Sequence, residues 1–308
     1  MNPYRFATTG RLGQAFKSLI DSHYPVLQCT YFETQEALAD QMHNYNAFAG
    51  FDLTDNIDIS HIKWIHSFGA GVDAFMQLPL PQDILLTRTT GNMGSRMAEY
   101  CLAYMLYAFK SIDEVHQNQQ QQKWAPLLLK DLKTASVLIF GTGNIGSSIA
   151  QVLQPLVHTV DGVNRSGSHV EGFHAIYQLT KPINYSQYDV IINTLPNTLE
   201  TNGLFDEQLF ALCNGSLFIN VGRGTAVVQH DLLQALDEGH ITKAVLDVFE
   251  EEPLPTSSPL WSHPGVVVTP HHASKTTADD VASSFKRIVE AIKAGIANDL
   301  FVDVSRGY

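Results

Sequence analysis

Short apolar runs alternate with stretches of helical spacing along the first 90 residues. The runs predict strands at residues 4–8, 26–31, 47–49, 64–67 and 84–87. The intervening spacing predicts helices at residues 10–23 and 34–43. Strands that alternate with helices are typical of a parallel sheet covered by helices on both faces, so this part of the chain is expected to form an α/β layer structure.

From Met97 to Val115, apolar residues recur every three or four positions, which predicts one long amphipathic helix. It runs into a glutamine-rich tract at 117–122, which we interpret as a solvated helix end or loop rather than an interaction segment. A second alternating series follows. Its predicted strands are residues 136–140, 158–163, 189–193, 216–220, 244–247 and 266–269, and a last amphipathic helix covers 280–294. The second series has the size of a doubly wound Rossmann sheet.

The composition is that of a globular chain, with 44% hydrophobic and 16% charged residues among 308. A net charge of -12 makes the chain a poor candidate for binding nucleic acid. We expect no membrane segment, because no apolar run approaches 18 residues, and no signal peptide. The cysteines Cys29, Cys101 and Cys213 lie far apart without a CxxC pair, which argues against disulfides or structural zinc and favours a cytoplasmic location.

A glycine motif follows the predicted strand 136–140 and opens a helical stretch. Gly141 permits the tight turn, Gly143 lets the backbone approach a pyrophosphate, and Gly146 lets helix and strand pack closely. The N–H groups of Asn144 and Ile145, together with the helix dipole, would meet the phosphate charge. The strand–turn–helix context makes this a dinucleotide fingerprint rather than an unliganded turn.

The end of the next strand determines which dinucleotide fits. An NAD enzyme usually places an acidic residue there to accept from the ribose 2′-OH. Here the positions hold Asn164, Arg165 and Ser166, while Asp161 comes three residues earlier, inside the strand. Two donors and a cation suit a 2′-phosphate. We therefore predict NADP as cofactor, with NADPH preferred and NAD as the alternative.

Three further motifs each follow an apolar strand: NVGRG at 220–224, LDVFEEEPL at 246–254 and VTPHHA at 268–273. Open α/β sheets bind ligands at the carboxyl ends of their strands, which is where these motifs fall. With the glycine motif, they make the chain resemble the D-2-hydroxyacid dehydrogenase family over nearly its whole length. Within the family it resembles the glyoxylate/hydroxypyruvate reductase branch, through FGAGVD at 68–73, MAEY at 97–100, LPNT at 195–198, PLW at 259–261 and SRGY at 305–308.

The resemblance implies a catalytic triad of Arg223, Glu252 and His271. Histidine suits a proton donor because its pKa lies near neutrality. A buried carboxylate at Glu252 would favour the imidazolium and orient the ring, and Arg223 can bridge the carboxylate and carbonyl of a 2-keto acid. We take Glu250 and Glu251 as solvated.

The resemblance also assigns residues to the cofactor and the substrate. Asp247 is expected at the nicotinamide end, with a strand-terminal cap as the alternative. The cofactor is further expected to border Leu195, Pro196, Val221 and Gly222. Ala70 and Gly71 would offer N–H groups to the substrate carboxylate from the other domain. His272 is read as local variation, and the remaining histidines lack metal-ligand spacing, so we expect no metal.

These expectations combine into two α/β domains. A flavodoxin-like substrate domain, built from residues 1–95 and 276–308, is interrupted by a dinucleotide-binding Rossmann domain at 96–275. The expected function is NAD(P)H-dependent reduction of glyoxylate or hydroxypyruvate to glycolate or D-glycerate, and the resemblance implies a homodimer. The alternatives are another 2-keto acid as substrate, a non-catalytic dinucleotide-sensing corepressor or scaffold, and a zinc-dependent alcohol dehydrogenase, which the missing zinc ligands disfavour.

Overall fold

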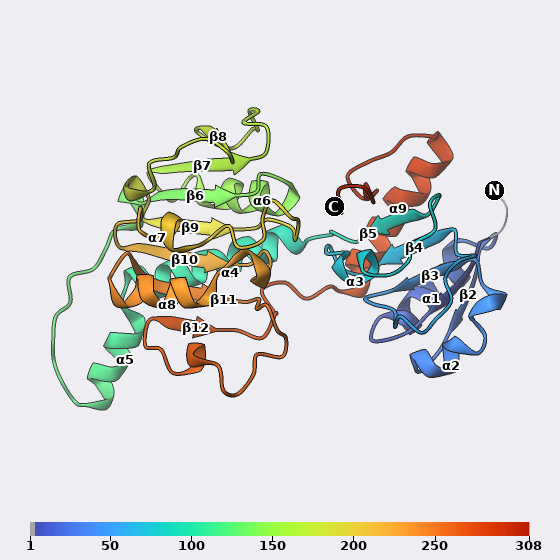
Figure 1. The fold of residues 1–308 in the computed structure, drawn as a ribbon, viewed down its shortest axis with the longest axis horizontal. Coiled ribbons are helices and arrows are strands. Elements are labelled where there is room, and N and C mark those ends of the chain that lie inside the picture. Colours follow the sequence, from blue (N-terminus) through green and yellow to red (C-terminus); the bar gives the residue numbers. More distant parts are fainter. Residues whose placement is uncertain (1–3, 308) are drawn as a thin grey trace. The chain divides into compact units, whose positions relative to one another are not determined.

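The computed structural model describes residues 4–307, so the predicted domain ends at 1–3 and 308 lie outside the described residues. The chain forms two compact units (Figure 1). The first combines the residues up to Met93 with those from Lys275 onward, and the second is Gly94–Ser274. The second unit is therefore inserted into the sequence of the first.

The first unit contains a five-stranded parallel sheet in the order β2-β1-β3-β4-β5. Its strands are β1 (Arg5–Thr8), β2 (Gln28–Tyr31), β3 (Ala47–Gly50), β4 (Trp64–Ser67) and β5 (Leu85–Arg88). Its helices are α1 (Gly13–His23), α2 (Gln35–Ala39), α3 (Asp73–Met76) and α9 (Ala278–Ala294). One face of the sheet packs on α1 and α9, where Trp64 and Phe285 stack with ring centroids 5.4 Å apart. Phe48, Ile65 and Leu86 form the core of the other face.

Helix α9 begins and ends where its sequence provides caps. Thr277 and Asp280 form a reciprocal capping box at its start, and Gly295 takes a left-handed conformation at its end. Between the caps, Val281, Phe285 and further apolar residues share one buried face. This pattern explains why the C-terminal segment packs against the N-terminal sheet.

The second unit contains a seven-stranded parallel sheet in the order β12-β11-β10-β9-β6-β7-β8. Its strands are β6 (Ser136–Phe140), β7 (Thr159–Asn164), β8 (Ile176–Gln178), β9 (Val190–Asn193), β10 (Ser216–Asn220), β11 (Ile241–Leu246) and β12 (Val266–Val268). Its helices are α4 (Met93–Phe109), α5 (Ile112–Gln120), α6 (Asn144–Leu153), α7 (Glu207–Phe210) and α8 (Gln229–Asp237). The strand order reverses between β6 and β9, which makes the sheet doubly wound. Sheets of this kind bind ligands at the carboxyl ends of the strands where the order reverses.

Helices cover both faces of this sheet. Successive residues of its strands point to opposite faces, and apolar side chains on each face are buried. Leu138 and Phe140 pack in one core with residues of α7 and α8, whereas Val137 and Ile139 pack in another with residues of α4 and α6. The predicted fold class, a doubly wound parallel sheet within a two-domain α/β chain, is confirmed.

The single long helix expected from Met97 is wrong. The chain forms α4 and α5, separated at Ser111, whose φ of 46° is left-handed. A left-handed residue interrupts a right-handed helix, and Ile112 and Val115 beyond the break are exposed rather than buried with the α4 residues. The glutamine-rich tract forms the largely exposed end of α5, as its polarity indicated.

Other differences are smaller. The helix expected at 10–23 begins at Gly13, because Gly10 has a φ of 75°. The helix expected at 34–43 divides into α2 and a 3-10 turn at Met42–Asn44. The half-buried edge strand β8 was not predicted, since three partly covered residues leave little periodic pattern. All three cysteines are buried and free. No helix among residues 4–307 is long and apolar enough to cross a membrane.

His66 on β4 gives the first unit a testable pH dependence. Its ring is fully buried, with Nδ1 3.1 Å from the Thr87 hydroxyl and Nε2 3.3 Å from the Thr89 hydroxyl. Burial lowers the pKa of His66 to about 3. Above the unfolded pKa of about 6.5 both states are neutral. As the pH falls below 6.5, the unfolded chain binds a proton that the folded chain does not, so folding stability is lost down to about pH 3.

We therefore expect the free energy of unfolding to fall by about 2 kcal/mol more in the wild type than in His66→Gln between pH 7 and pH 5. Chemical denaturation of both proteins at several pH values measures this difference. Parallel pH profiles for the two proteins would contradict the prediction.

Candidate active site

The carboxyl ends of β9 and β10 are joined by two buried asparagines. Asn193 Nδ2 donates to Asn220 Oδ1 at 2.9 Å. Asn193 Oδ1 also accepts from the Leu195 N–H at 3.0 Å, and Asn220 Oδ1 accepts from the Gly222 N–H at 3.1 Å. Asn220 Nδ2 donates to the Arg223 carbonyl at 3.0 Å. One pair of side chains thus holds the start of two loops that carry predicted site residues.

The loop after β10 lies against the loop after β11. A Cβ atom at Gly224 would fall 1.9 Å from the Phe249 carbonyl carbon, so only glycine allows these backbones to approach so closely. Arg223 is half-buried, and its Nη1 donates to the Gly222 carbonyl at 2.7 Å. The contact brings the loop that carries Arg223 beside the one that carries Glu252.

Glu252 and His271 meet as an ion-pair-like contact. Glu252 Oε1 accepts from the Phe249 N–H at 2.9 Å, and Glu252 Oε2 lies 2.8 Å from His271 Nδ1. Since Glu252 faces Nδ1, Nε2 is the ring nitrogen left for a substrate. The expectation that Glu252 is buried is wrong. The side chains of Glu252 and His271 are 34% and 58% exposed, because both lie on loops that follow strands of the sheet.

Asp247 fixes the loop that carries His271. Its carboxylate is buried and accepts three hydrogen bonds, from the Thr269 hydroxyl at 2.6 Å and from the N–H groups of His272 and Ala273 at 2.9 Å. The Asp247 carbonyl accepts from the His271 N–H at 2.9 Å. His271 has a φ of 48°, a conformation that costs energy for a non-glycine residue, and these bonds hold it there.

The hydrogen bonds around Asp247 also involve His272 and Tyr100. His272 contributes its backbone N–H to Asp247, while its ring lies 6.3 Å from that of Tyr100. The Tyr100 hydroxyl is 2.7 Å from the Thr269 hydroxyl and so extends the network into α4. Glu250 and Glu251 are exposed on the same loop as Glu252.

The glycine turn after β6 has the geometry of a phosphate cradle. Gly141 has a φ of 93°, and a Cβ at Gly146 would fall 1.8 Å from the Gly141 carbonyl oxygen. Gly143 is the N-cap of α6 without a side-chain cap, and a Cβ there would meet nothing within 4 Å. The first N–H groups of α6, which include Asn144 and Ile145, have no acceptor within the helix. Open space beside unpaired donors fits a pyrophosphate.

The turn after β7 borders this cradle. Asn164 Nδ2 donates to the Thr142 hydroxyl at 3.1 Å, and Asn164 Oδ1 accepts from the Gly167 N–H at 2.7 Å and from the Ser166 hydroxyl at 3.3 Å. Arg165 is exposed and pairs with Glu200 at 3.0 Å. These residues lie where a dinucleotide ribose is expected. Asn164 Nδ2 also donates to the Ser168 carbonyl at 3.1 Å, so its amide serves the turn, and the charged donor that faces a 2′-phosphate is the Arg165 guanidinium.

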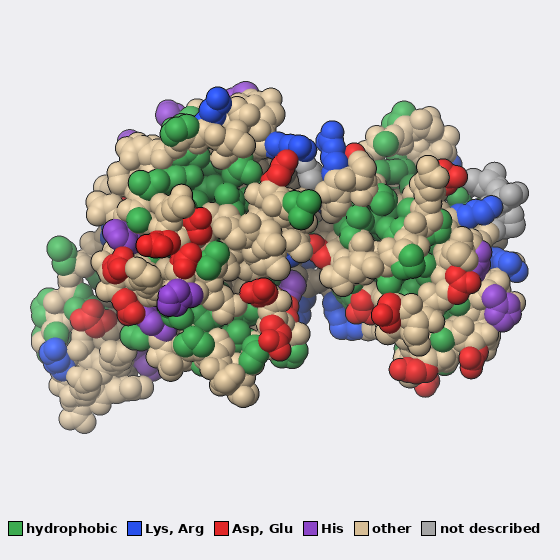
Figure 2. Space-filling view, in the orientation of Figure 1, with side chains coloured by type: hydrophobic (Ala, Val, Ile, Leu, Met, Phe, Trp, Pro, Cys, Tyr) green, Lys and Arg blue, Asp and Glu red, His purple; other side chains and the backbone are tan. Residues whose placement is uncertain are grey.

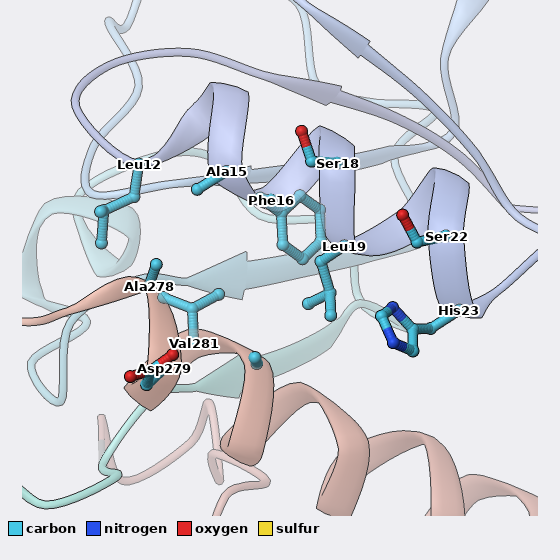
Figure 3. Close-up of a pocket in the computed structure, with 11 residues that line it drawn as sticks. Leu12, Ala15, Phe16, Ser18, Leu19, Ser22, His23, Ala278, Asp279 and Val281 are labelled. Carbon is cyan, nitrogen blue, oxygen red and sulfur yellow. The ribbon is translucent and has the colours of Figure 1, made fainter.

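Asp161 faces away from that turn. Its buried carboxylate accepts from the Tyr188 hydroxyl at 2.7 Å and from the Ala175 N–H at 3.0 Å. It lines a cavity of about 480 Å³ in the second unit, and none of the predicted site residues lines that cavity. A cavity of about 280 Å³ between α1 and α9 in the first unit also contains none of them (Figure 3).

The remaining predicted substrate residues belong to the first unit. Ala70 and Gly71 are half-buried in the turn after β4, where the Ser67 hydroxyl lies within hydrogen-bond distance of the Gly69 and Gly71 carbonyls. All other predicted site residues belong to the second unit. Among residues 4–307, no three His, Cys, Asp or Glu side chains gather closely enough to hold a metal ion.

Sequence reasoning assigned no role to Asn193, Asn220 or Glu200. The two asparagines had a detectable signal, because each is the last residue of an apolar strand and therefore a polar group that must find partners in the interior. Glu200 had none, since its pairing with Arg165 joins loops that are 35 residues apart.

Comparison with known proteins identifies relatives of this chain. Residues 102–273 match the sequence model of the "D-isomer specific 2-hydroxyacid dehydrogenase, NAD binding domain". The glyoxylate/hydroxypyruvate reductase A of Serratia proteamaculans is 37% identical over 257 residues, which cover 80% of this chain and 82% of that protein.

Two solved structures extend the similarity to nearly the full chain. A D-isomer-specific 2-hydroxyacid dehydrogenase family protein from Aeromonas salmonicida is 32% identical, with a TM-score of 0.86 over 99% of this chain and 100% of that one. An NADPH-dependent glyoxylate/hydroxypyruvate reductase from Sinorhizobium meliloti, solved with NADP and sulfate, is 26% identical, with a TM-score of 0.84 and the same coverage.

Proposed function

Since the chain belongs to the D-isomer-specific 2-hydroxyacid dehydrogenase family, we propose that it is an NADPH-dependent reductase of small 2-keto acids. The proposed substrates are glyoxylate and hydroxypyruvate, and the products are glycolate and D-glycerate. The observation that carries the proposal is the contact between Glu252 Oε2 and His271 Nδ1 at 2.8 Å, beside the loop of Arg223. The names of the Serratia and Sinorhizobium relatives support this choice of substrate.

The reaction requires a hydride at the carbonyl carbon and a proton on the carbonyl oxygen. When bound, the reduced nicotinamide supplies the hydride. His271 donates the proton from Nε2, because Glu252 faces Nδ1 and orients the ring. The left-handed backbone of His271, held by Asp247, fixes the direction of the ring before substrate arrives.

Arg223 binds the substrate carboxylate and polarises its carbonyl. Asn220 holds its backbone, and the close contact at Gly224 holds its loop, so the guanidinium extends from an ordered backbone. A planar guanidinium can bridge two oxygens, which suits the adjacent carboxylate and carbonyl of a 2-keto acid. Ala70 and Gly71 are proposed to give N–H groups to the same carboxylate.

The cofactor is assigned to the carboxyl ends of the strands in the second unit. The turn from Gly141 to Gly146 would hold the pyrophosphate, and Asn164, Arg165 and Ser166 the 2′-phosphate. Leu195, Pro196, Val221 and Gly222 would border it. Asp247 already accepts three bonds from its own loop, and its contact with the nicotinamide end stays a prediction.

We further propose a homodimer, working in the cytoplasm. Large apolar side chains are exposed on α5 and on the loop after it: Ile112, Val115, Trp124, Leu128 and Leu129. Figure 2 shows hydrophobic side chains along this segment, at the lower left of the view. Monomers rarely expose so many apolar side chains in one place, so a second copy of the chain is the proposed cover.

Replacing the proton donor tests the proposed chemistry. We expect His271→Gln to lower kcat about 10²- to 10⁴-fold with glyoxylate or hydroxypyruvate, because general acid catalysis supplies rate enhancement of that size. His272→Gln is the matched control, since its side chain is not assigned to the reaction. Near-normal turnover by His271→Gln would refute the assignment.

Substrate and cofactor choice are tested together with a panel of 2-keto acids and both reduced cofactors. We expect the highest kcat/KM with glyoxylate or hydroxypyruvate and NADPH. Arg165→Gln should reduce the preference for NADPH, since the variant lacks the cation for the 2′-phosphate. A clear NADH preference would contradict the cofactor proposal, and cofactor binding without turnover of any keto acid would favour the corepressor or scaffold alternative.

The dimer is tested by sedimentation of the wild type and of Leu128→Asp. We expect a dimer that the charged residue shifts to monomer, because a carboxylate in an apolar interface loses its hydration. Leu199→Asp, which changes an equally exposed leucine elsewhere in the second unit, should remain dimeric. A monomeric wild type would contradict the homodimer.

A further inference from the structure

We propose that Glu200 is a specificity-determining residue that competes with the cofactor 2′-phosphate for Arg165, and so limits the preference of this chain for NADP over NAD. The inference rests on the proposed function in one respect, the position of the 2′-phosphate beside Arg165. It adds a residue from a different loop to that site. The juxtaposition of Arg165 and Glu200, at 3.0 Å, is the observation behind it.

Three loops of the second unit meet at this place. The Asn164 amide donates to Thr142 in the glycine turn, which joins the turn after β7 to the cradle. The Thr194 hydroxyl after β9 lies 2.8 Å from the Phe140 carbonyl and 3.2 Å from the Gly141 carbonyl, which joins the third loop to the same cradle. The Arg165–Glu200 pair therefore spans the rim of one site.

The backbone beside Glu200 is well anchored. Its neighbour Thr201 is buried, and the Thr201 hydroxyl lies 2.7 Å from the Pro196 carbonyl and accepts from the Thr198 N–H at 2.9 Å. These Thr201 contacts hold the loop without using the Glu200 carboxylate. Glu200 can be replaced by glutamine without removing a contact that holds the loop.

Electrostatics gives the pair its effect on cofactor choice. The side chains of Arg165 and Glu200 are 64% and 55% exposed, so the pair is weak and a phosphate dianion can displace Glu200. While the pair is closed, Arg165 is neutralised, and after displacement the carboxylate still lies near the phosphate charge. Both effects reduce affinity for a 2′-phosphate. A cofactor with a free 2′-OH carries no charge at that position and is affected much less.

The test is the affinity of the full-length protein for NADP⁺ and NAD⁺, measured by calorimetry, which does not depend on turnover. We expect Glu200→Gln to tighten NADP⁺ about 2- to 5-fold at low ionic strength while NAD⁺ affinity stays the same. The gain should shrink at high salt because exposed charges are screened. In an Arg165→Gln background, the gain from Glu200→Gln should be smaller. Glu171→Gln removes one exposed carboxylate from the same unit and should leave both affinities unchanged.

Two results would overturn the proposal. If Glu200→Gln leaves the NADP⁺ affinity unchanged, Glu200 does not compete for Arg165. If it weakens NAD⁺ instead, Glu200 acts as an acceptor for the ribose 2′-OH. A wild type that binds NAD⁺ more tightly than NADP⁺ refutes the proposed cofactor preference, a failure that is distinct because the Glu200 proposal concerns the change between variant and wild type.

Discussion

Buried polar side chains at the carboxyl ends of three neighbouring strands hold the site together. Asn193, Asn220 and Asp247 lie in the interior, where a polar group without a hydrogen-bond partner costs about 1–3 kcal/mol. Each finds its partners in the backbone of the loops that leave the sheet. Because these side chains need hydrogen-bond partners, they fix the loops that carry Leu195, Arg223 and His271. The residues proposed for catalysis are therefore held on a rigid sheet.

Local arrangement also explains how an acidic protein can bind anions. The net charge of -12 opposes the approach of both proposed ligands, so capture must rest on nearby donors. The open cradle at Gly143, the N–H groups at the start of α6 and the side chains of Arg165 and Arg223 are the groups assigned to it. In the proposed competition for Arg165, the Glu200 carboxylate at the rim weakens this capture.

Much of the fold could be predicted because it follows from periodic burial. Strands such as Ser136–Phe140 and Ser216–Asn220 each contain an unbroken apolar run, and the glycine turn follows its strand directly. The break at Ser111 could not be predicted, since apolar spacing continues across it. The left-handed backbone of Ser111 and the exposure of Ile112 and Val115 appear only in the folded chain.

The site was predictable where a motif names its residues and less so where contacts join distant loops. Arg223, Glu252 and His271 stand in recognisable motifs, but the exposure of Glu252 and the pairing of Arg165 with Glu200 depend on the folded loops. The sequence indicated the role of Asp247 in fixing the His271 loop only through the alternative of a cap at a strand end. The reason is that the three groups that donate to Asp247 lie 22 to 26 residues later in the chain.

A double-mutant cycle, measured on turnover, tests whether Asp247 acts by positioning His271 or contributes to the reaction by itself. Asp247→Asn replaces one acceptor oxygen by a donor and should loosen the loop, so kcat should fall. If Asp247 acts through His271, the same change made in His271→Gln should cause little further loss, since residues that act as a unit are not additive. If the kcat losses of the two single variants multiply in the double variant, Asp247 does not act through His271 and contributes to the reaction separately.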